Sequence, residues 1–86
     1  MKIRFHGNFK KRYKKLRLNE RRKFNINLGL FIENQFSPAL NNHALRGKYS
    51  GCRSINVTGD LRAIYKLIDT NIAYFVAIDS HSNLYS

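Results

Sequence analysis

The chain has 86 residues, of which 43% are hydrophobic and 13% aromatic, so it can form one small domain over residues 1–86 and is too apolar to be disordered. Sixteen Lys and Arg against five Asp and Glu give a net charge of +11, which favours a nucleic acid or an acidic protein as partner. The single cysteine excludes an internal disulfide framework and fits a reducing compartment. With no signal peptide and no apolar stretch of spanning length, we expect a cytoplasmic location, no membrane partner, and no metal or other cofactor.

The N-terminal quarter carries most of the charge. Eleven basic residues and one acid, Glu20, occur between Lys2 and Lys23. Residues 2–6 alternate as in a short strand, with Ile3 and Phe5 pointing inward. Asn8 is then the expected N-cap of a first helix.

An apolar stripe at helical spacing follows this cap, formed by Phe9, Tyr13 and Leu16. Cations cover the rest of the helix: Lys10, Lys11, Arg12, Lys14 and Lys15. We expect this basic helix to bind RNA phosphates, ribosomal RNA above all, in a cleft separate from any catalytic site. A solvated helix face is the alternative reading of the same charges.

A second helix is predicted over residues 19–34, with Asn19 as its cap. Phe24, Leu28 and Phe31 have helical spacing, although residues 24, 26, 28 and 30 also alternate as in a strand. The length of the segment favours the helix. Residues 35–42 contain the only proline, Pro38, and are predicted to be a loop.

The second half of the chain reads as strands. Segments 51–57 and 61–68 are joined by a compact hairpin connection at residues 58–60, segment 72–78 is almost wholly apolar, and residues 79–86 form a short tail. The prediction is an α+β fold of order β-α-α-β-β-β. Its two N-terminal helices pack on one face of a mostly antiparallel four-stranded sheet, which leaves the other face for a substrate.

Three titratable side chains stand at turns or strand ends in this half: His43, Asp60 and His81. In a meander, the 58–60 hairpin and the end of the last strand lie at the same edge, so Asp60 and His81 are expected to be neighbours. Spacing alone does not place His43. Histidine transfers protons at neutral pH, and a carboxylate can act as a base or orient a histidine. These are the groups that attack of a ribose 2′-OH on its own phosphate requires.

The same region offers candidate substrate-binding residues. Arg53, Arg62 and Lys48 could bind phosphate, and Tyr85 could stack on a base of single-stranded RNA. Each has a structural alternative: the arginines could be plain surface cations, and Tyr85 could pack the C-terminal tail.

Four fragments, in order and spacing, resemble the RelE/YafQ-type toxins of bacterial toxin–antitoxin pairs. They are His43-Ala-Leu-Arg-Gly, Gly51-Cys-Arg-Ser-Ile, Gly59-Asp-Leu-Arg-Ala-Ile-Tyr and Ser80-His-Ser-Asn-Leu-Tyr. The resemblance implies a RelE-like fold, catalytic positions at His43, Asp60 and His81, and an aromatic at Tyr85. Asn56 stands where the YafQ-like branch has another catalytic histidine, and Leu61 where a Trp is usual. Asn56 could therefore only hydrogen-bond to substrate.

The resemblance also implies a function. The chain would be the toxin of a type II toxin–antitoxin system, a metal-independent, ribosome-dependent endoribonuclease (an mRNA interferase). Its partners would be mRNA on the ribosome and a cognate antitoxin with an acidic segment. A non-catalytic RNA- or ribosome-binding protein and a ParE-like gyrase-inhibiting toxin remain the alternatives.

Overall fold

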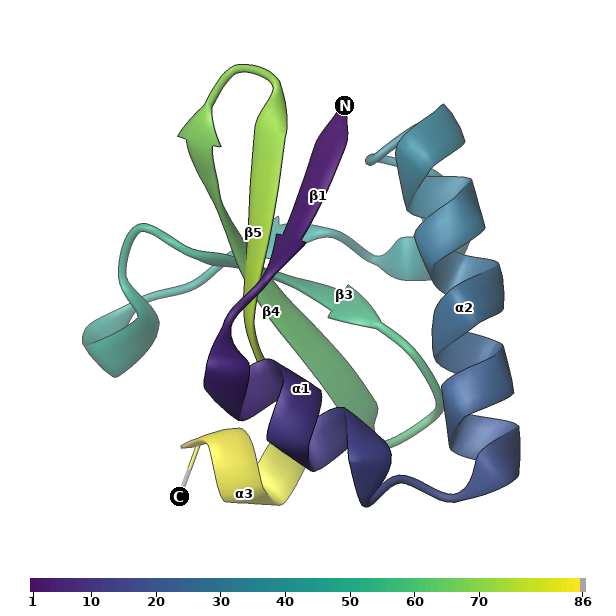
Figure 1. Ribbon diagram of the computed structural model, residues 1–86. Helices are drawn as coiled ribbons and strands as arrows, with labels where there is room; N and C mark the ends of the chain where they lie inside the picture. Colours follow the sequence, from purple (N-terminus) through teal and green to yellow (C-terminus); the bar gives the residue numbers. More distant parts are fainter. Residues whose placement is uncertain (86) are drawn as a thin grey trace.

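The computed structural model describes residues 1–85, so Ser86, the last residue of the expected tail, lies outside the described part (Figure 1). The elements are β1 (Lys2–Phe5), α1 (Gly7–Lys14), α2 (Leu18–Glu33), the 3-10 turn η1 (Pro38–Leu40), β2 (His43–Ala44), the 3-10 turn η2 (Gly47–Tyr49), β3 (Arg53–Asn56), β4 (Leu61–Asp69), β5 (Ile72–Ser80) and α3 (His81–Tyr85).

The strands form one mixed sheet of order β1-β5-β4-β3-β2. β1 runs parallel to β5, and all the other neighbours are antiparallel. The predicted α+β class is confirmed. The sheet has five strands rather than four because the short β2 pairs with β3, His43 opposite Ser54. The segment that was predicted to be tail also differs, since residues 81–85 form α3.

The two long helices lie close to their predicted places, but their caps differ. The N-cap of α1 is His6, whose Nδ1 accepts a hydrogen bond from the Asn8 N–H at 3.0 Å. α2 begins at Leu18, and its N-cap is Arg17, whose backbone N–H donates to the Glu20 carboxylate at 2.9 Å. The predicted caps Asn8 and Asn19 are therefore wrong by two residues each, because His and Glu supplied the acceptors that the free N–H groups need.

An aromatic core fills the space between the helices and one face of the sheet. Phe9, Phe24, Phe31, Tyr65 and Phe75 are all buried, and their ring centroids lie 4.8–5.9 Å apart in successive pairs. Burial of each such ring stabilises the fold by about 1.5–3 kcal/mol. This core fixes β4 and β5 and so determines where their ends lie.

The other side of the sheet, here called the second face, is marked by Arg62, Ile64 and Lys66, which alternate along β4. Ile64 is fully buried and Leu84 nearly so, although neither belongs to the aromatic core. α3 contacts β5, and Figure 1 places η2 on the side of the sheet opposite α2. The centre of the second face is thus covered, which corrects the expectation of a wholly free face. Across residues 1–85 no helix has the length and apolar character needed to cross a bilayer.

Candidate functional site

Asp60 and His81 lie together at one end of the sheet. The His81 N–H, at the start of α3, donates to the Asp60 carbonyl at 2.9 Å, and the adjoining residues Leu61 and Ser80 are cross-strand partners. Both side chains are exposed. Within the described residues, neither the Asp60 carboxylate nor the His81 imidazole has a hydrogen-bond partner. The backbones of Asp60 and His81 are therefore adjacent, and both residues have exposed titratable side chains.

Aromatic rings flank this pair. Tyr85, one helical turn after His81, has its ring 4.8 Å from the imidazole, and the Tyr49 ring meets Tyr85 edge-on at 6.4 Å. Lys48 lies with its Nζ 5.3 Å from the centre of the Tyr49 ring. Burial raises the pKa of the Tyr49 hydroxyl, and Tyr85, Asp79 and Cys52 add to the effect. Tyr49 is therefore a protonated hydrogen-bond donor at neutral pH.

His43 shares the second face but not this cluster. It is exposed on β2, opposite Ser54, and its Nδ1 lies 2.8 Å from the Asn41 carbonyl oxygen. Two strand spacings and four residues along β4 separate it from Asp60, which corresponds to roughly 16 Å between backbones. His43 therefore lies on the same face of the sheet as Asp60 and His81, but at a different place on that face.

Asn56 of β3 and Arg62 of β4 are cross-strand partners. The Arg62 guanidinium donates to the carbonyl oxygens of Thr58 (2.9 Å), Leu61 (3.2 Å) and Gly59 (3.1 Å), so it braces the hairpin and keeps two of its five N–H groups for a ligand. The Asn56 Oδ1 is buried, and no residue from 1 to 85 forms a hydrogen bond with it. Leu61 is buried in the core, so it offers no stacking surface.

Arg53 points the other way. Its cross-strand partner is Tyr65, a core residue, which places Arg53 on the helix-covered face, away from His43 and Arg62. Its Nε donates to Asn42 Oδ1 at 2.7 Å, and its guanidinium lies 5.3 Å from the Phe36 ring centre. Arg53 is therefore not a plain surface cation: it holds Asn42, the residue that precedes His43.

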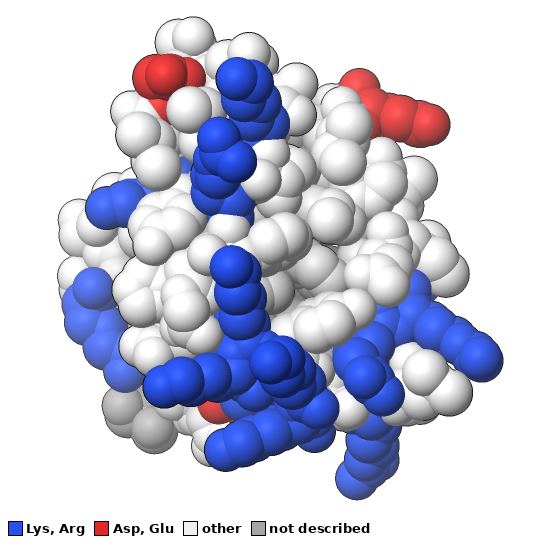
Figure 2. Space-filling model, in the orientation of Figure 1, with Lys and Arg blue, Asp and Glu red and all other residues white. Residues whose placement is uncertain are grey.

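The basic helix is adjacent to the Asp60–His81 end, not in a separate cleft as expected. Lys10, Lys11, Lys14 and Lys15 are exposed, whereas Arg12 forms an ion pair of 2.9 Å with Asp79, two residues before His81. Figure 2 shows Lys and Arg gathered over α1 and continuing upward along β1, with most acidic surface at the upper margins. Arg12 is thus a link between α1 and β5 and is not a free cation.

Asp79 was missed in the sequence, although its place directly before Ser80-His81 is a signal. Burial alone would raise its pKa, but hydrogen bonds from Arg12, the Ser80 N–H and Asn83 lower it below the ordinary value of 3.8. Asp79 is therefore ionised at neutral pH and ties β5, α1 and α3 together. Within residues 1–85 no three His, Cys, Asp or Glu side chains are grouped as metal ligands.

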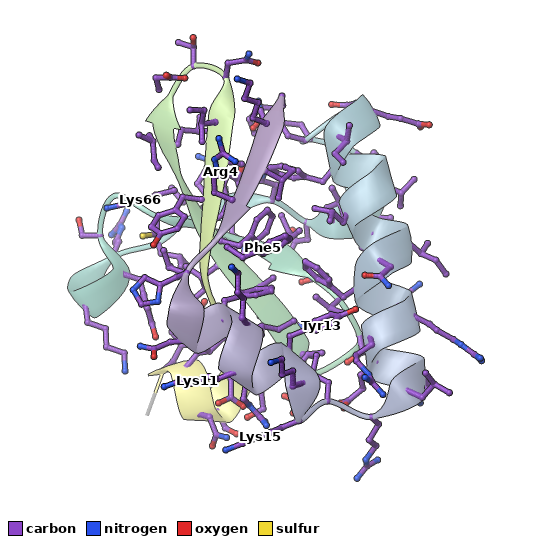
Figure 3. All side chains as sticks on the ribbon, viewed as in Figure 1. Arg4, Phe5, Lys11, Tyr13, Lys15 and Lys66 are labelled. Carbon is purple, nitrogen blue, oxygen red and sulfur yellow. The ribbon has the colours of Figure 1, made fainter. Side chains whose placement is uncertain are left out.

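A groove of about 480 Å³ lies between α1, α2 and β1. Its walls are mostly apolar and its rim is basic: Phe5, Phe9, Tyr13, Phe24, Leu28 and Asn25, with Lys10 and Lys14. Figure 3 shows Phe5 and Tyr13 on the side of the sheet that faces α2. The groove is distinct from the second face and suits an apolar segment that carries negative charge.

The fold is similar to those of solved bacterial toxins. A histidine-to-glutamine mutant of YafQ from E. coli matches with a TM-score of 0.78 at 23% identity, over 98% of this chain and 97% of that chain. A copper-bound mutant toxin from Helicobacter pylori matches with a TM-score of 0.75 at 26% identity, over 99% of both chains. The E. coli DinJ–YafQ complex matches with a TM-score of 0.75 at 24% identity, over 98% of this chain and 97% of that chain.

No curated protein sequence is significantly similar to this chain. The family described as "Bacterial toxin of type II toxin-antitoxin system, YafQ" matches residues 1–86, the whole sequence. The RelE/YafQ resemblance drawn from the four sequence fragments is thereby confirmed. The chain belongs to the YafQ family of bacterial toxins of type II toxin–antitoxin systems.

Proposed function

We propose that this toxin is an endoribonuclease that cleaves mRNA on the ribosome. The observation that carries the proposal is the juxtaposition of Asp60 and His81. Their exposed side chains form no hydrogen bond within the described part of the chain, and the bond from His81 N–H to Asp60 O joins their backbones. A protein that only binds RNA has no need of such a pair.

The chemistry needs one base and one acid. The base takes the proton of a ribose 2′-OH as this oxygen bonds to the adjacent phosphorus, and the acid gives a proton to the 5′-oxygen as its bond to phosphorus breaks. Asp60 and His81 supply these two proton transfers, which contribute about 10²–10⁴-fold in rate when the groups are correctly placed. The products are a cyclic phosphate and a 5′-hydroxyl, and no metal ion is required.

Neighbouring side chains would hold the phosphate and the base. The two free N–H groups of Arg62, the Lys48 ammonium and the Tyr49 hydroxyl can donate to phosphate oxygens, while Tyr85 offers a ring for stacking. His43 and Asn56 would contact the RNA farther along the second face, because His43 lies too far from Asp60 to share a proton with it.

Two further partners belong to the proposal. The exposed lysines of α1 would bind ribosomal RNA, since the part of the chain that the structure describes gives them no acidic partner. The second partner is an antitoxin, as DinJ is in the complex with E. coli YafQ. An antitoxin segment with apolar anchors and acidic flanks would fit the groove between α1 and α2, where Lys10 and Lys14 complement its charge.

A translation reaction tests the activity. Purified toxin is added to a defined cell-free system, and new 5′ ends on the mRNA are mapped with translation running and with initiation blocked. We expect toxin-dependent ends only when ribosomes translate. Absence of new ends in both reactions would contradict the proposal, and ends in the blocked reaction would contradict ribosome dependence.

One observation favours a second function, non-catalytic binding to the ribosome. Asn56 cannot exchange a proton at neutral pH, and His43 is remote from Asp60, so the acid–base set is reduced to two residues. In the same experiment, this function predicts slower translation and co-sedimentation with ribosomes, with no cleaved mRNA.

A further inference from the structure

We propose that Tyr74 is the floor of a second RNA-binding site, in which a base of the single-stranded substrate stacks about 20 Å from the Asp60–His81 end. The inference rests on the proposed function, because it assigns RNA as the ligand. Its site is a shallow pocket of about 510 Å³ that none of the residues discussed above as catalytic enters. The pocket is lined by Ile3, Arg4, Phe5, Lys10, Ile68 and Tyr74.

The sheet register places two of these lining residues, Arg4 and Tyr74, in one row with Lys66, which lies beside the pocket. Arg4 of β1 is opposite Tyr74 of β5, which in turn is opposite Lys66 of β4. Cross-strand partners project from the same face, so two cations flank one ring. In Figure 3, Arg4 and Lys66 lie in the upper part of the molecule, away from Lys11 and Lys15 of α1 at its foot.

The chemistry of this row fits a nucleotide. Tyr74 is half-buried, and one side of its ring is supported by the His6 ring, whose centroid lies 5.8 Å away. Arg4, Lys10 and Lys66 are exposed, and no carboxylate in residues 1–85 lies within 4.0 Å of them. Single-stranded nucleic acids are bound by this combination, in which bases stack on aromatic rings and cations follow the phosphates.

The row shares a face of the sheet with the candidate catalytic end, although the buried Ile64 lies between them. Arg62 and Lys66 alternate on the same face of β4, opposite Asp79 and Tyr74 respectively. From Tyr74 to His81 the chain advances seven residues of mostly extended strand, or about 20 Å. One aromatic ring, Tyr74, therefore lies near the start of β5, and another, Tyr85, lies in α3 beyond its end.

Equilibrium binding to a fluorescein-labelled 2′-O-methyl decanucleotide tests the site, since this probe has no free 2′-OH and is not cleaved. Stacking of one base on an aromatic ring corresponds to a loss of about 5- to 150-fold in affinity on removal of the ring. We expect this loss for Tyr74→Ala and for Tyr74→Leu, and near wild-type affinity for Tyr74→Phe. Phe36→Ala removes an exposed ring from the opposite side of the sheet and is the matched control.

Two further probes assign the ligand. The same oligonucleotide without bases should bind equally to Tyr74→Ala and to wild type. Arg4→Ala and Lys66→Ala should each reduce the slope of the logarithm of the binding constant against the logarithm of the salt concentration by about 0.7. A labelled Glu-rich decapeptide should bind wild type and Tyr74→Ala alike. Equal loss of oligonucleotide and peptide binding would make the site a peptide surface and overturn the inference.

Circular dichroism of each variant establishes that it is folded, and Tyr74→Leu retains apolar bulk in β5 should Tyr74→Ala unfold. Wild-type affinity of Tyr74→Leu for the oligonucleotide would overturn the inference even if the wild-type toxin cleaves mRNA. Conversely, loss of binding in this variant would uphold the Tyr74 site even if the wild-type toxin produces no mRNA ends, and only the proposed activity would then fail.

Discussion

The two faces of the sheet differ in how well their side chains are packed and hydrogen-bonded. On the helix-covered face, Phe9, Phe24 and Phe75 pack ring against ring and are almost fully buried. On the second face, the buried Ser54 Oγ and Asn56 Oδ1 have no hydrogen-bond partner within residues 1–85, and the Asp60 and His81 side chains have none there either. In the helix layer the same is true only of Arg21 Nε, again within the described residues. Unmatched polar groups reduce stability, which suggests that the second face is arranged for a ligand and the first for folding.

Substitutions on the two faces should therefore separate activity from stability. The largest effect is expected at His81, on the second face. His81→Ala removes one proton-transfer group and should lower the single-turnover cleavage rate of ribosome-bound mRNA by about 10²–10⁴-fold. Because the side chain is exposed, the free energy of unfolding should change by less than about 0.5 kcal/mol. Ser82→Ala, the next residue of α3, is the control, and undiminished cleavage by His81→Ala would exclude the assigned role.

The opposite pattern is expected in the core. Phe75→Ala leaves a cavity among Phe9, Phe24 and Phe31 and should lower the free energy of unfolding by about 3–5 kcal/mol, measured by urea denaturation. Its folded fraction should cleave mRNA at the wild-type rate. A folded but inactive Phe75→Ala protein would show that the two faces are not independent.

α1, the basic helix, offers a further test of the difference between the two faces, because it borders both of them. Reversal of three exposed charges (Lys10, Lys11 and Lys14 to Glu) should weaken ribosome association. It should also reduce the slope of the logarithm of the binding constant against the logarithm of the salt concentration, by about 0.7–0.9 for each phosphate contact that is lost. The matched control is the reversal of Arg17, Arg22 and Lys23, which changes the net charge equally but lies at the start of α2. Equal effects of the two triple variants would mean that total charge matters and the position of the charges does not.

The smallest effect is expected at the link between α1 and β5. The lowered pKa of Asp79 means that its ionised form stabilises the folded state above its ordinary pKa of 3.8, and that this contribution is lost as the pH falls through the lowered value. Asp79→Asn should reduce the free energy of unfolding at pH 7 by at most about 1 kcal/mol, because the Arg12 partner is partly exposed. Urea titrations of both proteins should converge in acid, and a difference that persisted below pH 3 would point to packing instead.

Local pattern determined much of the architecture. The alternation of Leu61, Ala63 and Tyr65 with Arg62, Ile64 and Lys66 identified a strand and its two faces, because side chains of a strand alternate with a period of two. The hairpin at residues 58–60 brought Asp60 beside His81 for the same reason. The charge of α1 and the family resemblance also followed from the sequence alone.

Other features depended on contacts between distant segments. β2 has only two residues and so has no period to recognise, and it forms only because β3 is beside it. The direction of Arg53 follows from its pairing with Tyr65, and the role of Arg12 follows from Asp79, 67 residues later in the chain. The row of Arg4, Tyr74 and Lys66 likewise exists only because β1 joins the sheet beside β5.

The sequence by itself thus determined the two main helices, the longer strands with their faces, and the family of this protein. Only the tertiary structure decided which cations are paired, how far His43 lies from Asp60, and which residues gather around Tyr74. The physical reason is that periodicity is a property of neighbouring residues, whereas sheet register and ion pairing are fixed by the packing of the whole core.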